Sequence, residues 1–281
     1  EILTYSFVSP RGVDKINLPA NDEKRNFVKI MNPLGEETSV MRTTLIPNML
    51  DVISTNISHK VEEVSAFECG NTFIPQEGLP IETKKYCVGM YGKEVDFFVL
   101  KGVIESVLNN VGLKGYEIEP ETTNLTFHPG RCAKIVYNNI YIGTFGELHP
   151  DVIENYNLGQ RVYVAEINID TVFENLNLTK SYNPLPKYPS TSRDIALIVK
   201  DEVFVKQIED IIKANGEDLV ESYKLFDVYK GAQIEEGHKS IAYSITYRSK
   251  DKTLTDEDVA KVHEKILSEL SEKLNANLRS N

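Results

Sequence analysis

The stretch Arg193-Asp-Ile-Ala-Leu-Ile-Val-Lys200 decides the fold of the last third of this chain, because its apolar side chains alternate in the manner of a β-strand. Four further apolar residues then recur at helical spacing: Val205, Ile208, Ile211 and Ile212. The pair Asn215-Gly216 that follows is a typical helix stop. The sequence therefore predicts a strand that leads directly into an amphipathic helix.

Two more strands and a second helix follow. The runs 219–230 and 238–248 are rich in Tyr, Phe, Ile and Val, and the loop 231–237 between them begins and ends with glycine, which predicts a hairpin. Thr255, with Asp258 three residues later, is a variant of the capping box that opens a helix. Its apolar stripe consists of Val259, Val262, Ile266, Leu267, Leu270 and Leu274. With a last strand at 276–279, the order is βαββαβ, a sheet packed on two helices.

One face of this sheet is suited to bind RNA. Asp227 and Tyr229 are two residues apart on a strand, so both side chains leave the same face. A carboxylate accepts hydrogen bonds from the two N–H donors of a guanine Watson–Crick edge, and a tyrosine ring offers a stacking surface to an unpaired base. The alternative is that Asp227 caps the hairpin and Tyr229 packs on the sheet.

The motifs Arg193–Val199, Leu225-Phe-Asp-Val-Tyr-Lys-Gly231 and Gly237-His-Lys-Ser240, in this order, carry a family resemblance. Residues 186–281 resemble the ferredoxin-like anticodon-binding domain that closes the β subunit of bacterial phenylalanyl-tRNA synthetases. The resemblance implies that four residues contact the anticodon of the phenylalanine tRNA: Asp227, Tyr229, Ser240 and Arg279.

The charge of the chain limits the kind of nucleic-acid binding that can be expected. The 281 residues have a net charge of -11, which argues against indiscriminate binding of polyanions. Residues 185–281 carry 15 Lys and Arg against 18 Asp and Glu, a net charge of -3, and residues 1–184 have the remaining -8. A tRNA site therefore needs a local basic rim. Its candidates for contact with the tRNA backbone are Lys187, Arg193, Lys230, Arg248 and Lys250, with Lys239 and Lys252 beside them; the alternative for any single lysine is a solvated surface.

The boundary of this module is visible in the sequence. Tyr182-Asn-Pro-Leu-Pro-Lys-Tyr-Pro189 contains three prolines, each of which removes a backbone donor and disfavours helix in the preceding residue. We therefore expect an extended linker at 182–189 between a larger unit at 1–181 and the module at 190–281. The strand-like start at Glu1, without a methionine, suggests that the chain begins inside a longer protein.

The larger unit mixes strand and helix patterns. Strands are expected at 1–8, 64–74, 133–137, 140–147 and 162–167, and helices from Met41–Leu50 to Ile57, at 97–111 and near 171–173. Asn138-Asn139 joins two of the strands as a hairpin turn. Antiparallel hairpins interleaved with helices indicate an α+β fold and not a doubly wound sheet.

A second resemblance covers most of residues 1–175. It rests on five short motifs in a fixed order: Asn32-Pro-Leu-Gly35, Met41-Arg-Thr-Thr-Leu45, Phe67-Glu-Cys-Gly-Asn-Thr-Phe73, His128-Pro-Gly-Arg-Cys-Ala133 and Gly146-Glu-Leu-His-Pro150. They resemble the catalytic-like domain of the same β subunits, which has the antiparallel sheet of class II aminoacyl-tRNA synthetases.

The chemistry of amino-acid activation excludes this unit as an active site. Activation needs cations at the ATP phosphates, because the negative charge that develops on the pentavalent phosphorus centre and the leaving pyrophosphate is stabilised chiefly by electrostatics. Class II enzymes supply one arginine just after a strand, where this chain has Ile74, and another in a glycine-rich motif, where this chain has Tyr163–Asp170 with neither arginine nor a glycine run. We therefore predict a catalytic-like domain without catalytic residues.

Other candidate sites are weaker. His128, Cys132 and His149 are of metal-ligand type but match no closed zinc spacing, and His-Pro turns explain the histidines more simply. Glu68 and Glu147 could form an acid/base pair, or be ordinary capping or solvated carboxylates. Arg42 and Arg131 could bind a ligand or a partner, or tie loops together. We predict no metal site.

The resemblance implies the partners and cofactors. The chain would be the C-terminal part of the β subunit of a phenylalanine–tRNA ligase, a scaffold for the α subunit in an (αβ)₂ assembly and a reader of the tRNA anticodon. ATP and magnesium would be used by the complete enzyme, and none would be bound by this part. Three cysteines without paired spacing, and no signal or membrane-spanning segment, indicate the cytoplasm. The alternative is a free-standing pseudo-synthetase paralogue that binds RNA or protein; a single-chain organellar enzyme would retain the missing arginines.

Overall fold

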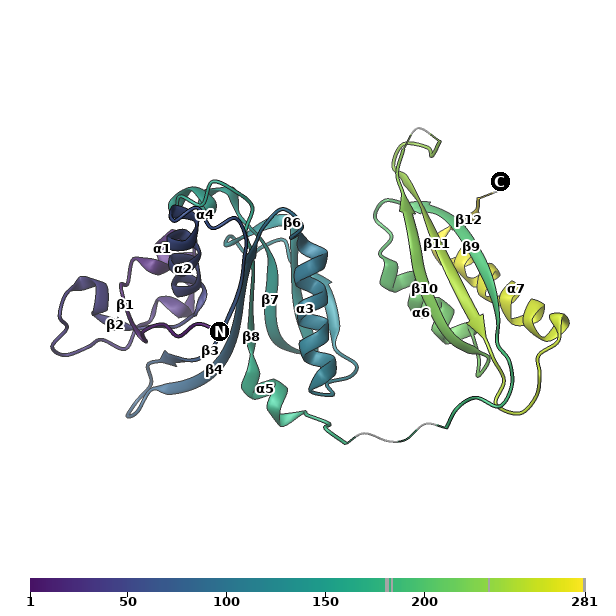
Figure 1. Ribbon diagram of the computed structural model, residues 1–281, viewed down its shortest axis with the longest axis horizontal. Coiled ribbons are helices and arrows are strands. Elements are labelled where there is room, and N and C mark those ends of the chain that lie inside the picture. The colour runs from purple at the N-terminus through teal and green to yellow at the C-terminus, as the bar shows by residue number, and fades with distance from the viewer. Residues whose placement is uncertain (180–181, 183, 232, 280–281) are drawn as a thin grey trace. The chain divides into compact units, whose positions relative to one another are not determined.

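The computed structural model describes residues 1–179, 182, 184–231 and 233–279. The chain divides into two compact units, Glu1–Lys180 and Ser181–Asn281 (Figure 1). Two residues of predicted segments lie outside the described ones: Asn183 in the predicted linker at 182–189 and Ala232 in the predicted hairpin loop at 231–237. None of the helices in the described part is long and apolar enough to cross a membrane.

The first unit is built on a six-stranded antiparallel sheet. Its spatial order is β3-β4-β8-β7-β6-β5. The strands are β3 (Val64–Ile74), β4 (Ile81–Tyr91), β5 (Glu117–Pro120), β6 (Phe127–Tyr137), β7 (Ile140–Leu148) and β8 (Tyr163–Asn168). The α+β fold class predicted from the sequence is confirmed, and so is the antiparallel sheet.

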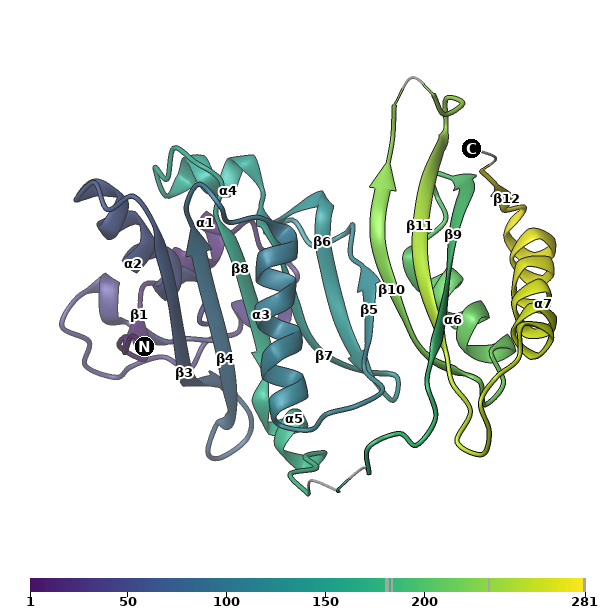
Figure 2. The same ribbon diagram turned by 45° about the vertical axis from the view of Figure 1, so that its right-hand side comes forward.

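Two helices cover opposite faces of this sheet. Helix α2 (Ile46–Ser58) packs on the face that carries Ala66, Cys87 and Val164, and α3 (Phe97–Asn110) packs on the face that carries Val88, Phe145 and Ala165 (Figure 2). Both helices bury one apolar stripe, as their periodicity predicts. Asp96 caps α3 by accepting a hydrogen bond from the Val99 amide at 2.8 Å.

The remaining elements of this unit are short. They are β1 (Phe7–Val8), α1 (Gly12–Lys15), β2 (Val40–Met41), α4 (Pro150–Asn155), α5 (Ile169–Glu174) and two 3-10 turns, Glu23–Arg25 and Glu36–Thr38. β1 pairs with β2, so the strand expected at 1–8 is confined to its last two residues. Both residues of the Asn138-Asn139 turn have positive φ, 49° and 63°, as a two-residue hairpin turn requires.

The second unit has the predicted element order. It consists of β9 (Thr191–Lys200), α6 (Val205–Asn215), β10 (Val220–Tyr229), β11 (His238–Tyr247), α7 (Asp256–Leu274) and β12 (Asn277–Leu278). The strands form an antiparallel sheet in the order β10-β11-β9-β12, and α6 and α7 pack against each other on one of its faces (Figure 2). The predicted ferredoxin-like sandwich is confirmed.

Local signals explain why α7 begins and ends where it does. Thr255 Oγ1 accepts from the Asp258 amide at 3.2 Å, and the Asp258 carboxylate accepts from the Thr255 amide at 3.1 Å, which is the predicted capping box. Asn275 then ends the helix in the left-handed conformation, with φ 50°. The chain turns there and adds β12 to the sheet beside β9.

Candidate nucleic-acid interface

The face of the second sheet that points away from α6 and α7 is the candidate RNA surface. On β9, Ile195, Leu197 and Val199 are buried against the helices, and on β11 the same is true of Ile241, Tyr243, Ile245 and Tyr247. Because side chains alternate along a strand, the residues between them lie on the opposite face, which we call the open face.

The strand register arranges the open face in rows that run across the sheet. Tyr229 lies opposite Ser240, Ser240 opposite Ile198, and Ile198 opposite Asn277. We call these four residues the Tyr229 row. The next row, the Asp227 row, contains Asp227, Ala242, Ala196 and Arg279, whose amide donates to the Ala196 carbonyl at 2.9 Å. All four residues expected at the anticodon therefore lie in two adjacent rows of one face.

The side chains of Tyr229 and Arg279 meet although β10, which contains Tyr229, and β12, which Arg279 directly follows, form opposite edges of the sheet. The guanidinium carbon of Arg279 lies 5.6 Å from the centre of the Tyr229 ring, within the range of a cation–π interaction. Arg279 also donates to Gln233 Oε1 at 3.0 Å. The small side chains of Ala196 and Ala242 lie between the two edges and let the arginine reach across.

The surroundings of Tyr229 shape this surface further. A Cβ added to Gly231 would lie 2.5 Å from the Tyr229 hydroxyl, so glycine leaves room for the ring. Ser240 is only 3% exposed, because its short side chain lies in a central strand between larger neighbours. A bulge between Leu225 and Asp227 interrupts β10 and leaves Phe226, 54% exposed, beside Asp227 at the edge of the sheet.

Several cations of the candidate basic rim have partners within the second unit. Arg193 alternates with Ile195 and so lies on the helix side, where it pairs with Asp256 at 2.7 Å. Lys230 pairs with Asp201 at 2.6 Å, and Lys239 Nζ donates to the Asp201 carbonyl at 2.9 Å. Burial, more than the neighbouring Lys230, lowers the pKa of Lys239.

The other cations of the rim fall into two groups. Arg248 is held by Glu221 at 2.8 Å and by the Tyr188 carbonyl, and Lys252 is held by both oxygens of Asp258. Lys187 and Lys250 are exposed. Lys187 and Lys250 are thus the rim candidates whose charge is presented to solvent.

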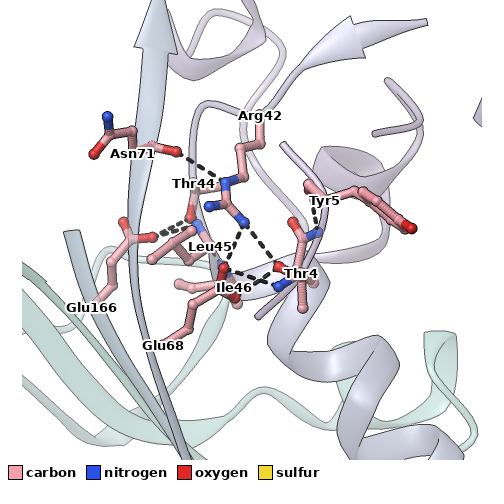
Figure 3. A network of polar contacts seen from close by, with 10 residues as sticks. Thr4, Tyr5, Arg42, Thr44, Leu45, Ile46, Glu68, Asn71 and Glu166 are labelled. Carbon is pink, nitrogen blue, oxygen red and sulfur yellow. Dashed lines mark hydrogen bonds and ion pairs between the residues drawn. The ribbon is translucent and has the colours of Figure 1, made fainter. Parts of the chain in front are cut away.

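The first unit has a buried polar network around Arg42 (Figure 3). Arg42 and Glu68 form an ion pair at 2.9 Å, with side chains 4% and 2% exposed. Arg42 also donates to the Asn71 carbonyl and to Thr4 Oγ1. Through Nε and Nη1 the buried guanidinium joins the N-terminal segment to β3, which is a structural role and not that of a phosphate clamp.

A second buried carboxylate completes this network. Glu166 Oε1 accepts from Thr44 Oγ1 and from the Leu45 amide, both at 2.7 Å, and so fixes the turn that opens α2 (Figure 3). Glu166 and Glu68 lie in one row of the sheet on either side of Cys87. Burial, and then these two carboxylates, raise the pKa of the Cys87 thiol well above its ordinary value.

The other candidate residues have structural partners. Arg131 holds Glu147 with two hydrogen bonds, at 2.6 and 2.8 Å. Burial raises the pKa of Glu147, but the hydrogen bonds and charge of Arg131 outweigh it, so the pKa is lowered. Glu68 and Glu147 leave opposite faces of the sheet and form no acid/base pair.

The two histidines have the turn roles expected as the simpler explanation. His128 Nδ1 accepts from the Gly130 amide at 3.0 Å, and His149 Nδ1 accepts from the Asp151 amide at the start of α4. Among the described residues, no group of three His, Cys, Asp or Glu side chains could hold a metal ion.

Sequence reasoning did not identify several residues that shape these sites. Gln233, Ala196 and Ala242 were not predicted, because their roles depend on strand register, although the alternation on β9 and β11 could have placed the two alanines on the open face. Glu166 was not predicted either. It is the one acidic residue in the mostly apolar strand Tyr163–Asn168, and a buried carboxylate of this kind indicates a buried hydrogen-bond partner.

Comparisons with known proteins agree with these two units. Residues 1–169 match the family described as phenylalanyl tRNA synthetase beta chain CLM domain, and residues 186–279 match the ferredoxin-fold anticodon binding domain. Over 99% of its length, this chain is 47% identical to the phenylalanine--tRNA ligase beta subunit of Clostridium tetani and 46% identical to that of Clostridium acetobutylicum. It is 37% identical to the beta subunit of Symbiobacterium thermophilum. The chain spans 35%, 36% and 33% of the lengths of these relatives.

Proposed function

Because the chain belongs to the family of phenylalanyl-tRNA synthetase β chains, we propose that it is the C-terminal part of a phenylalanine–tRNA ligase β subunit and reads the tRNA anticodon through the open face. The observation that best supports this proposal is the contact between Tyr229 and Arg279. The two rows to which these residues belong also contain Asp227 and Ser240. Stacking on Tyr229 and hydrogen bonding to Asp227 together suit an unpaired guanine.

The first unit serves as a scaffold in this proposal. Its buried Arg42–Glu68 network and the replacement of the expected arginine by Ile74 leave no cation for ATP phosphates at these positions. ATP and magnesium are therefore used by the complete enzyme, through the α subunit. The working location is the cytoplasm.

A groove of about 770 Å³ beside α2 is the proposed contact surface for the α subunit. The N-terminal segment presents Leu3 and Tyr5, 84% and 83% exposed, at its edge. Asn48 and Tyr156 also line the groove, and among the described residues the Oδ1 atom of the first and the hydroxyl of the second are buried without a hydrogen-bond partner. Exposed apolar side chains at the edge of a groove favour a protein partner that covers them. The family resemblance implies an (αβ)₂ assembly for the complete enzyme.

The proposal is tested by titrating the chain with a hairpin that carries the phenylalanine anticodon, beside the same hairpin with its first anticodon guanine replaced by adenine. Each titration is performed at two salt concentrations. We expect saturable binding that weakens on the replacement at both salts. Equal and purely salt-driven binding of the two hairpins would instead indicate an electrostatic contact without base reading, as a paralogue with another RNA or protein partner would make.

A further inference from the structure

Strand β12 contributes one side chain to the Tyr229 row. Asn277 lies opposite Ile198, and Leu278 lies opposite Leu197, which is buried against the helices. Alternation therefore places Asn277 on the open face and Leu278 on the other side. Asn277 is exposed, and its side chain forms no hydrogen bond within the described part of the chain.

The Tyr229 row repeats one pattern twice. In each half of the row, a side chain with a flat or apolar surface is followed by a polar side chain. The first half is Tyr229 and Ser240, and the second half is Ile198 and Asn277. Neighbouring strands are about 4.8 Å apart, so Tyr229 and Ile198 are separated by about 10 Å. That separation is too large for one base to cover both surfaces. The row thus provides two places for bases, side by side on one sheet, as other sheet-based RNA modules do.

We infer that Ile198 and Asn277 form a second base subsite, in which Asn277 recognises an anticodon adenine. This inference rests on the proposed function. A side-chain amide has one donor and one acceptor in a plane, which match N7 and the 6-amino group of adenine in a bidentate pair. The phenylalanine codons UUU and UUC require adenines at the second and third anticodon positions, next to the guanine assigned to Tyr229 and Asp227.

The backbone holds Asn277 in place independently of its side chain. Asn275 ends α7 in the left-handed conformation, and β12 pairs with β9 through backbone groups. The guanidinium of Arg279 lies over Tyr229 and binds Gln233. A substitution at the exposed Asn277 therefore removes the amide without altering the fold or the Tyr229 subsite.

The test is the binding of the chain to anticodon hairpins in which each anticodon adenine in turn is replaced by purine, which lacks only the 6-amino group. We expect the unsubstituted chain to lose affinity on one of the two replacements. Asn277→Ala should bind the unmodified hairpin about 5- to 150-fold more weakly, corresponding to one bidentate pair, and should no longer distinguish adenine from purine at that position.

The matched control is Leu278→Ala, which alters the neighbouring residue on the opposite side of the same strand. It should leave affinity and base preference unchanged. If Asn277→Ala retains the full preference for adenine at both positions, the second subsite is wrong, while a preserved preference for the first guanine leaves the proposed function intact. If the unsubstituted chain has no preference at any anticodon position, the proposed function itself is wrong, and this subsite with it.

Discussion

The guanidinium carbon of Arg279 lies 5.6 Å from the ring centre of Tyr229, although the two residues are 50 positions apart and lie at opposite edges of one sheet, Tyr229 in β10 and Arg279 directly after β12. The contact joins the C-terminal strand to the hairpin strand across the open face. A residue near the end of the chain thereby becomes part of the same surface as Asp227 and Ser240, which is where the proposed anticodon contact is made.

Replacing Tyr229 should separate stacking from hydrogen bonding. Tyr229→Ala removes the ring, and we expect hairpin binding to weaken by about 1–3 kcal/mol. Tyr229→Phe keeps the ring and should bind nearly as well as the unsubstituted chain. The measurement is a fluorescence titration with a labelled hairpin. Equal losses for the two variants would show that the hydroxyl, and not the ring, makes the contact.

Lys250 should contribute charge and no base preference. It is exposed in the loop that follows β11, whereas Lys252 is paired with Asp258 at 2.8 Å. Lys250→Ala should reduce the slope of log affinity against log salt by about 0.7 if one phosphate contact is lost, and should weaken all hairpins equally. Lys252→Ala is the control, with a smaller change in slope. A change in base preference in Lys250→Ala would contradict the assignment.

The Arg42–Glu68 pair should stabilise the first unit through its burial. Glu68→Ala leaves a buried guanidinium without its carboxylate, and we expect the free energy of unfolding to fall by about 3–5 kcal/mol. Urea unfolding followed by circular dichroism measures the change. Arg42→Met combined with Glu68→Leu removes both charges and should be less destabilising than either single change.

An exposed pair in the same unit provides the control for this experiment. Arg11 and Glu36 lie 3.0 Å apart, with side chains 70% and 53% exposed. Glu36→Ala should cost less than about 1 kcal/mol, because exposed ion pairs are screened by water and salt. A comparable loss in Glu36→Ala and Glu68→Ala would mean that burial does not determine the energy of the Arg42–Glu68 pair.

His263 should make the stability of the second unit depend on pH. Its Nδ1 lies 2.9 Å from the Tyr247 hydroxyl, and burial, followed by the charge of Arg193, lowers its pKa below the ordinary value of 6.5. Between these two pKa values the unfolded chain binds more protons than the folded one. The stabilisation is therefore complete above about pH 6.5 and is lost as the pH falls through 6.5 toward the folded pKa.

The free energy of unfolding, measured by urea denaturation between pH 7.5 and 5.5, should accordingly decrease toward the acid side. His263→Gln should flatten this dependence, whereas His238→Gln, in the same unit but at the start of β11, should leave it in place. An unchanged pH dependence in His263→Gln would assign the effect to another group.

Local sequence signals predicted much of the fold correctly. The alternation on 193–200, the Asn215-Gly216 stop and the Thr255–Asp258 capping box are short-range patterns, and the structure has the predicted strand and the two predicted helices there. Strand β4 (Ile81–Tyr91) was missed because charged and polar residues fill its first half, and its burial comes from its neighbours β3 and β8. The strand expected at 1–8 shrank to Phe7–Val8, since only these residues find a pairing partner in β2.

The sequence by itself determined which residues are available for RNA contact and which catalytic groups are missing, because residue type and strand alternation are local properties. Tertiary structure decided which of them meet. The register of four strands brings Arg279 to Tyr229, places Asn277 in the same row and turns Arg193 to the helix side. These relations depend on pairing between segments far apart in the chain, where a shift of one residue would move every side chain to the opposite face.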